Sequence, residues 1–153
     1  MKWPLLLSIV VLPTMGVAAQ SSRPAAQPNT EAANPLVGAW KLASLQEPAA
    51  DGRPRAGSCT GMFVFTADGN AAVQVMCPDT QTSTAYAQNG YEASFGRYHI
   101  DGRSSTFTFH IDGALVRTLI GQDLKRAYQL SGNKLIVTST DPNEHWKVVW
   151  ERY

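Results

Sequence analysis

The chain has 153 residues, of which 13 are basic and 12 are acidic, and 44% of its residues are hydrophobic. This near balance of charge argues against a nucleic-acid partner and against a polybasic membrane-binding surface. The part that follows residue 35 is long enough for one ordinary domain and too short for two.

The first 19 residues have the layout of a secretory signal peptide. Lys2 precedes an apolar stretch from Trp3 to Leu12, and small residues occupy positions 17–19. The apolar stretch is too short to cross a bilayer as a permanent helix, so we expect cleavage after Ala19 and no stable membrane anchor. Cleavage removes Lys2 and leaves 12 basic and 12 acidic side chains. We therefore predict a secreted or periplasmic protein.

Residues 20–35 are rich in Ala, Pro, Ser and Asn and have no apolar periodicity. Such a composition buries too little apolar surface to fold, so we expect a disordered spacer. The folded domain is predicted to occupy residues 36–153.

The domain contains eight segments of strand character. Polar loops at 47–58 and 78–90 flank one hairpin, the second loop has room for a short helix, and an irregular crossover is expected at 113–121. The predicted strands are 36–46, the two arms of the hairpin 59–77, 93–100, 105–111, 123–130, 134–140 and 146–153. Consecutive strands with short links are typical of an eight-stranded antiparallel up-and-down β-barrel. A β-sandwich is the competing architecture, but most links look too short for its crossing connections.

Cys59 and Cys77 are the only cysteines, and they stand at the two ends of that hairpin. The Asp-Gly pair at 68–69 favours either a two-residue turn or a three-residue loop that ends in a left-handed Gly. The three-residue loop 67–69 places the cysteines directly opposite each other at a narrow, non-hydrogen-bonded pair, whereas the two-residue turn points them to opposite faces. An oxidising compartment and this register predict a disulfide, which would contribute about 3 kcal/mol.

Six segments together resemble the bacterial lipocalin-like domain family, and the resemblance spans residues 34–153. They are "NPLVGAWKL", "GMFVFTADGNAAVQVM", "SFGRYHID", "FHIDGAL", "GQDLKRAYQLSGNKLIVTST" and "VVWERY". The resemblance implies a calycin-type eight-stranded barrel and says little about activity. The chain departs from the family in its cysteine pair, in its signal and spacer, and in having Leu119-Ile120 where a Trp usually precedes the crossover Gly.

The resemblance also implies a structural closure at one end of the barrel. Gly38 and Trp40 form the family's Gly-x-Trp motif in the first strand, and Arg152 lies in "WERY" of the last strand. The expected contact is a cation–π interaction with burial of the arginine stem, which is a structural role.

The apolar face of the hairpin predicts one wall of a ligand cavity. Residues at odd positions, namely Phe63, Phe65, Val73 and Val75, share a face with the two cysteines and are larger and more uniformly apolar than residues at even positions. We expect this face to point inward.

Three polar residues are candidate ligand contacts. His110 matches a family block in which Asp112 takes the acid position, and it lies inside only if the Thr face of 105–111 points inward. Phe residues on the opposite face favour the arrangement in which His110 lies outside. Arg126 and Tyr128 match a second family block, in which Arg126 either contacts an anionic head group inside or makes an outer salt bridge.

The sequence offers no catalytic or cofactor motif. The three histidines lack metal-ligand spacing, and no nucleophile elbow or phosphate-binding glycine loop occurs. We therefore predict no metal, no cofactor and no nucleic-acid partner.

Three functions fit the sequence, and a barrel that binds a small hydrophobic or amphipathic ligand comes first. The second is an inhibitor or interaction barrel that meets a protein partner through loops 47–58 and 78–90, with Arg53-Pro54-Arg55 as the contact. The third is a barrel isomerase or cyclase, which requires an ionisable residue inside.

Overall fold

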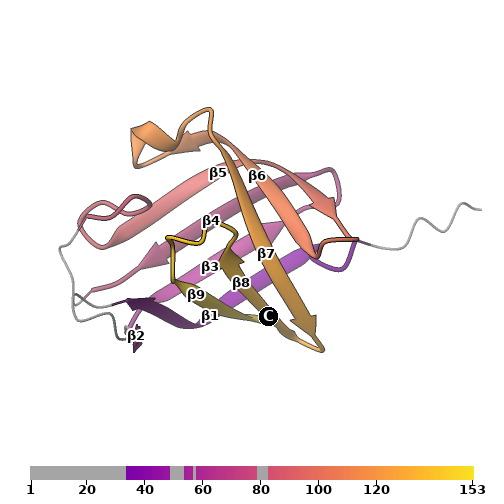
Figure 1. The fold of residues 1–153 in the computed structure, drawn as a ribbon, viewed down its shortest axis with the longest axis horizontal. Helices are drawn as coiled ribbons and strands as arrows, with labels where there is room; N and C mark the ends of the chain where they lie inside the picture. Colours follow the sequence, from indigo (N-terminus) through magenta and orange to yellow (C-terminus); the bar gives the residue numbers. More distant parts are fainter. Residues whose placement is uncertain (1–33, 49–53, 57, 79–82) are drawn as a thin grey trace, which may run out of the picture. The chain divides into compact units, whose positions relative to one another are not determined.

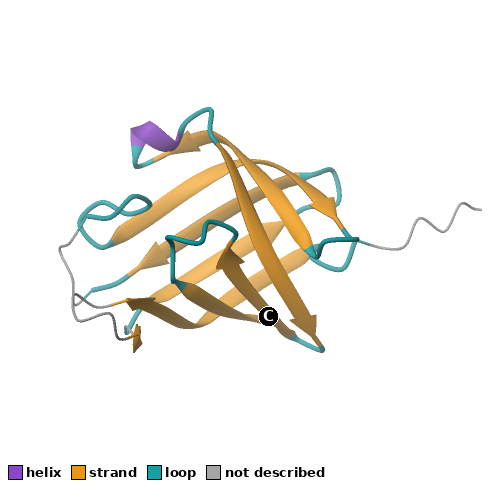
Figure 2. Cartoon of the chain, in the orientation of Figure 1, coloured by secondary structure: helices purple, strands orange, loops and turns teal. Residues whose placement is uncertain are grey.

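The structure is a computed structural model that describes residues 34–48, 54–56, 58–78 and 83–153. Figure 2 shows that this part of the chain is mostly strand, with one short 3₁₀ helix. The elements are β1 (Gly38–Pro48), β2 (Pro54–Ala56), β3 (Thr60–Phe65), β4 (Asn70–Met76), β5 (Tyr91–Asp101), β6 (Thr106–Ala114), η1 (Arg117–Leu119), β7 (Asp123–Ser131), β8 (Lys134–Ser139) and β9 (Lys147–Arg152). The predicted signal peptide 1–19 and nearly all of the spacer 20–35 lie outside the described residues.

Eight of the strands close into an antiparallel up-and-down barrel, as predicted. Each of β3 to β9 pairs with its neighbour in the sequence, and β1 pairs with both β3 and β9 (Figure 1). This closure leaves no long free edge among the eight strands. Within the described residues, no helix has the length and hydropathy required to span a bilayer.

Strand β2 was not predicted, because the segment around it contains two prolines and reads as a loop. It pairs with the end of β1 through Gln46 opposite Ala56 and Pro48 opposite Pro54. Proline is tolerated there because β2 is a short edge strand that needs few backbone donors.

The hairpin of β3 and β4 has the predicted register. Phe63 lies opposite Val73, and the Thr66 N–H donates to the Asn70 carbonyl at 2.8 Å. Gly69 has φ +86°, the left-handed conformation that a three-residue loop requires at this position.

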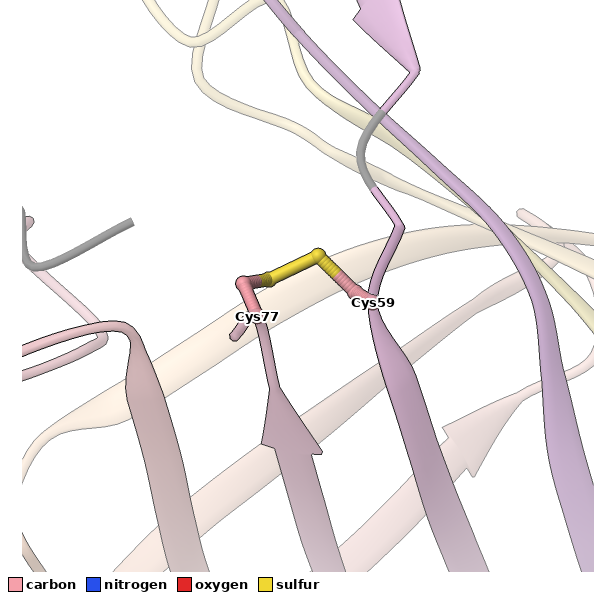
Figure 3. Close-up of a disulfide and its surroundings, with 2 residues drawn as sticks. All are labelled: Cys59 and Cys77. Atoms are coloured by element: carbon pink, nitrogen blue, oxygen red, sulfur yellow. A yellow bond between two sulfur atoms is a disulfide. The ribbon is translucent and has the colours of Figure 1, made fainter. Parts of the chain in front are cut away.

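The predicted disulfide between Cys59 and Cys77 is confirmed. The bond joins the start of β3 to the end of β4 (Figure 3). The Cα atoms are 4.1 Å apart, which suits the narrow, non-hydrogen-bonded type of antiparallel pair.

Strand alternation decides which side chains fill the barrel. Phe107, Phe109 and Ile111 of β6 are buried, and Phe63 and Phe65 of β3 are buried with them. Side chains at the positions between them face outward, because successive residues of a strand point to opposite faces. The other buried apolar residues in the described part of the chain are Leu36, Trp40, Leu42, Ala71, Val73, Val75, Tyr98, Leu119, Leu135, Val137 and Trp150.

One end of the barrel is closed by Trp40 and Arg152. The guanidinium carbon of Arg152 lies 4.1 Å from the centre of the Trp40 ring, and its nitrogens donate to the carbonyls of Val37 at 2.8 Å and Pro35 at 3.0 Å. The Trp40 indole N–H donates to the Leu36 carbonyl at 2.8 Å. The charged group therefore fixes the chain that enters β1 against the last strand.

Candidate functional site

The barrel encloses a cavity of about 520 Å³ at the end opposite the Trp40 closure. Its walls are mainly apolar side chains from the strands, and loop residues complete it. The lining residues are Leu42, Leu45, Glu47, Ser58, Cys59, Phe63, Val73, Val75, Cys77, Thr84, Tyr86, Ala87, Gly90, Glu92, Ser94, Phe107, Phe109, Leu119, Leu124, Arg126, Val137, Trp146, Val148 and Trp150. Ser58 and Thr84 are exposed, so the cavity reaches solvent at this end.

Aromatic rings form the floor of the cavity. The centre of the Phe63 ring lies 6.2 Å from that of Phe107, 5.9 Å from that of Phe109 and 5.6 Å from that of Trp150. The Trp150 indole N–H has no hydrogen-bond partner among the described residues, and its nitrogen is sealed from solvent. The floor is therefore apolar to any molecule in the cavity.

Arg126 enters the cavity from β7 and is held between two rings. Its guanidinium carbon lies 5.0 Å from the centre of the Tyr86 ring and 4.9 Å from that of Trp146. Its Nη1 is 3.8 Å from Glu144 Oε2, and only 11% of the side chain is exposed. The guanidinium thus has two aromatic faces and an acid as partners inside the protein.

Glu144 contacts Arg126 and both of the aromatic side chains beside it. It accepts hydrogen bonds from the Tyr86 hydroxyl and, at 3.2 Å, from the Trp146 indole N–H. Burial alone would raise the pKa of Glu144, but hydrogen bonds from Ser139, Tyr86 and Trp146 and the charge of Arg126 outweigh burial and lower it. Glu144 is therefore ionised at neutral pH and balances the charge of Arg126.

Glu92 of β5 is the second acid in the cavity wall, and it lacks a partner of this kind. Its side chain keeps partial access because it faces the cavity, and among the described residues it makes no hydrogen bond or ion pair. Burial raises its pKa to about 7, Arg126 partly opposes this shift, and Glu47 adds to it. Near neutral pH the carboxyl is therefore divided between its charged and neutral forms.

Four of the predicted ligand-binding residues line the cavity, and they are Phe63, Val73, Val75 and Arg126. The alternative in which Arg126 makes an outer salt bridge is wrong, because the even positions of β7 face the interior. The anion that neutralises Arg126 comes from the protein itself, so the expected carboxylate head group is not needed.

Phe65 and Tyr128 lie inside the barrel but do not line the cavity. Phe65 packs with Tyr98 and Phe107, whose ring centres are 5.0 and 5.5 Å away, and Tyr128 packs with Phe107 at 6.4 Å. Phe65 pairs with Gly38 at the closed end of the barrel. Their predicted ligand contacts are therefore corrected to core packing.

His110 lies outside the barrel, which corrects its candidate role as an interior ligand contact. Phe109 and Ile111 occupy the inner face of β6, so His110 points outward between two acids. Its Nδ1 is 2.7 Å from Asp123 Oδ1, its Nε2 is 3.7 Å from Asp112 Oδ1, and 36% of the side chain is exposed.

The predicted protein-contact loops are described only in part. Residues 49–53, 57 and 79–82 of the loops 47–58 and 78–90 lie outside the described residues, and Arg53 is among them. The described part of the second loop, 83–90, contains no helix. Within the residues that the structure describes, no group of three or more His, Cys, Asp or Glu side chains could hold a metal ion.

Four members of the site were not predicted from the sequence, namely Glu92, Tyr86, Trp146 and Glu144. Alternation along β5 could have found Glu92, because the charged residues Arg97 and His99 lie at odd positions and Glu92 lies on the opposite face. Tyr86 and Glu144 lie in loops, where no periodicity indicates which side chains turn inward.

Comparison with known proteins identifies the family of the barrel. A lipocalin-like domain family model matches residues 37–153. No curated protein matches the chain. Similar solved structures include a lipocalin-like protein from Bacteroides uniformis, with 16% identity and a TM-score of 0.48. The match covers 77% of this chain and 98% of the Bacteroides protein. An uncharacterized protein from Bacteroides eggerthii is 14% identical, with a TM-score of 0.46 and coverage of 77% and 99%.

The family match includes every strand of the barrel and every residue that lines the cavity. The chain therefore belongs to the lipocalin-like domain family.

Proposed function

We propose that the protein is an exported barrel that binds one small hydrophobic or amphipathic molecule in its cavity. The observation that carries this proposal is the cavity of about 520 Å³ with an aromatic floor and walls that are more apolar than polar. Cavities of roughly 300–1,000 Å³ with mostly apolar walls and a few placed polar groups are typical of small-molecule sites. A barrel that acted only through its loops would not need this interior space.

Export is supported by two independent features of the chain. The first 19 residues have the layout of a signal peptide, and the disulfide between Cys59 and Cys77 is of the kind that persists in oxidising compartments.

A neighbouring pair of valines in β9 provides a matched test. Val148 lines the cavity and lies opposite Leu45 and Val137, which also line it. Val149 is the next residue and lies opposite Ser44 and Ile136, none of which lines the cavity. Val148→Phe should therefore fill part of the cavity, whereas Val149→Phe adds the same ring to the outer face.

The experiment is a fluorescence titration with Nile red, an uncharged hydrophobic dye. We expect one saturable site in the wild type and in Val149→Phe, and a dissociation constant at least tenfold larger in Val148→Phe, about 1.4 kcal/mol. Equal binding by the two variants would show that the dye lies outside the cavity and would refute the proposal.

A second candidate is a barrel isomerase, because an ionisable group that titrates near neutral pH lies in the wall. A carboxyl with a pKa of about 7, such as that of Glu92, suits proton transfer to and from a bound carbon acid. Native mass spectrometry of protein purified from its own host would identify a bound molecule. That molecule should gain deuterium in D₂O with wild-type protein and not with Glu92→Gln; a molecule that returns without deuterium excludes this candidate.

A further inference from the structure

Glu92 is placed in the cavity by the backbone of β5. The side chains of Ser94 and Tyr98 are buried on the same face, and Val75, which lies opposite Glu92 on β4, lines the cavity. The carboxyl therefore projects into the cavity from the start of β5, where this strand is paired with β4. A buried carboxylate without a partner is costly, so this position favours a ligand that supplies one.

Arg126 does not serve as that partner. No ion pair joins the two side chains, and the guanidinium is stacked between Tyr86 and Trp146 and paired with Glu144 at 3.8 Å. Moving Arg126 to Glu92 would break both ring contacts and leave Glu144 without its cation.

The charges of the described lining residues add up to an acidic interior. Two acids line the cavity, Glu47 and Glu92, and the single base among them, Arg126, is neutralised by Glu144, which lies just behind the wall. An anionic head group would add a like charge beside Glu92, whereas a cationic head group would remove an unpaired one.

We propose that the cavity selects amphipathic molecules that carry a basic amine, with the ammonium group paired to Glu92 and the apolar body against the aromatic floor. This inference rests on the proposed binding function and names the chemical class of its ligand. The apolar contacts would come from Phe63, Val75 and Val148, and the ammonium would give Glu92 the partner that the protein does not provide.

The pairing makes affinity depend on pH. The carboxyl of Glu92 must lose its proton before it can pair with an ammonium, and the charged groups that face it are Glu47 from β1 and Arg126 from β7. Because the pKa of Glu92 in the empty cavity is about 7, the ionised fraction rises about tenfold between about pH 6 and about pH 8. Affinity for an amine should rise by the same factor over this range.

The test compares three ligands that have the same eight-carbon chain, namely octylamine, 1-octanol and octanoate, by displacement of Nile red. Octylamine remains charged, and octanoate remains ionised, at both about pH 6 and about pH 8. We expect octylamine to bind at least tenfold more tightly than octanoate at the higher pH and to lose about tenfold at the lower pH. The affinity of 1-octanol should not change by more than about twofold.

Two variants assign the effect to one residue. Glu92→Gln keeps the shape of the side chain and should abolish both the preference for octylamine and its pH dependence, while 1-octanol still binds. Glu151→Gln is the control, since Glu151 of β9 does not line the cavity, pairs with Lys134 at 3.7 Å and should leave the preference in place. The pH dependence of the wild type provides a measurement even if Glu92→Gln does not fold.

Each outcome is decisive. Octanoate binding as tightly as octylamine, or pH dependence that survives in Glu92→Gln, overturns the amine inference and leaves the binding function intact, because 1-octanol and Nile red report that function separately. Failure of all three ligands and of the dye to bind overturns the binding function itself.

Discussion

Gly38 is the position where one methyl group should do the most damage to the closed end of the barrel. Its φ is +132°, a conformation that side-chain-bearing residues rarely adopt, and a Cβ placed there would lie 2.6 Å from Nη1 of Arg152. Gly38→Ala therefore strains the backbone and displaces the guanidinium from Trp40.

The two effects can be given magnitudes. An alanine at such a φ costs about 1–3 kcal/mol. Displacement of Arg152 loses a cation–π contact of about 1 kcal/mol and two hydrogen bonds that together contribute only about 1 kcal/mol, since Arg152 is exposed. We expect Gly38→Ala to lower the free energy of unfolding by about 4 kcal/mol.

Two other glycines separate these effects in urea unfolding followed by tryptophan fluorescence. Gly121 has φ +82° and Gly102 does not have a positive φ, and a Cβ at either position would meet no atom within 4 Å. Gly121→Ala should cost about 1–2 kcal/mol and Gly102→Ala close to zero. In an Arg152→Ala background, Gly38→Ala should retain only its backbone cost. Equal losses for Gly38→Ala and Gly121→Ala would refute the role assigned to Arg152.

Two further predictions concern the disulfide and the acid in the cavity. Replacing Cys59 and Cys77 by Ser should lower the free energy of unfolding by about 3 kcal/mol, because the bond closes a segment with a sequence separation of 18. If the variant is still less stable than the reduced wild type, the loss does not come from the disulfide. For Glu92, the folded pKa of about 7 lies above its ordinary value of 4.5, so the folded state binds the proton more tightly and stability falls as pH rises from 4.5 to 7. Relative to Glu92→Gln, the wild type should lose about 3 kcal/mol across that window in urea unfolding at several pH values, and parallel pH profiles would contradict the shift.

Most of the fold was predictable from the sequence because strand period and turn chemistry agree along the chain. The Asp-Gly turn allowed two registers of β3 and β4, and the three-residue loop, which places the two cysteines opposite each other, is the one that the structure has. Alternation in β6 likewise favoured the arrangement with Phe109 inside and His110 outside. Strand β2 was not predicted, because its residues have no strand pattern of their own and only their pairing with β1 makes them a strand.

The candidate site was predictable only in part, because alternation reports the face of a residue and not its height along the barrel axis. Phe63 and Phe65 share a face, yet Phe63 lies under the cavity and Phe65 lies in the closed end. The partner of Arg126 could not be predicted either, since Glu144 reaches it from a loop that has no periodicity.

The chain enters and leaves the barrel at the same end. Arg152 holds the carbonyls of Pro35 and Val37, and the Tyr153 N–H donates to the Ala39 carbonyl at 3.1 Å. Cys59, just before β3, and Val148, near the start of β9, line the cavity and lie toward the opposite ends of those strands. A biotin group or sensor-chip linker attached at Tyr153 would therefore stand on the far side from the cavity, and the interior of the immobilised barrel would remain open to ligands in solution.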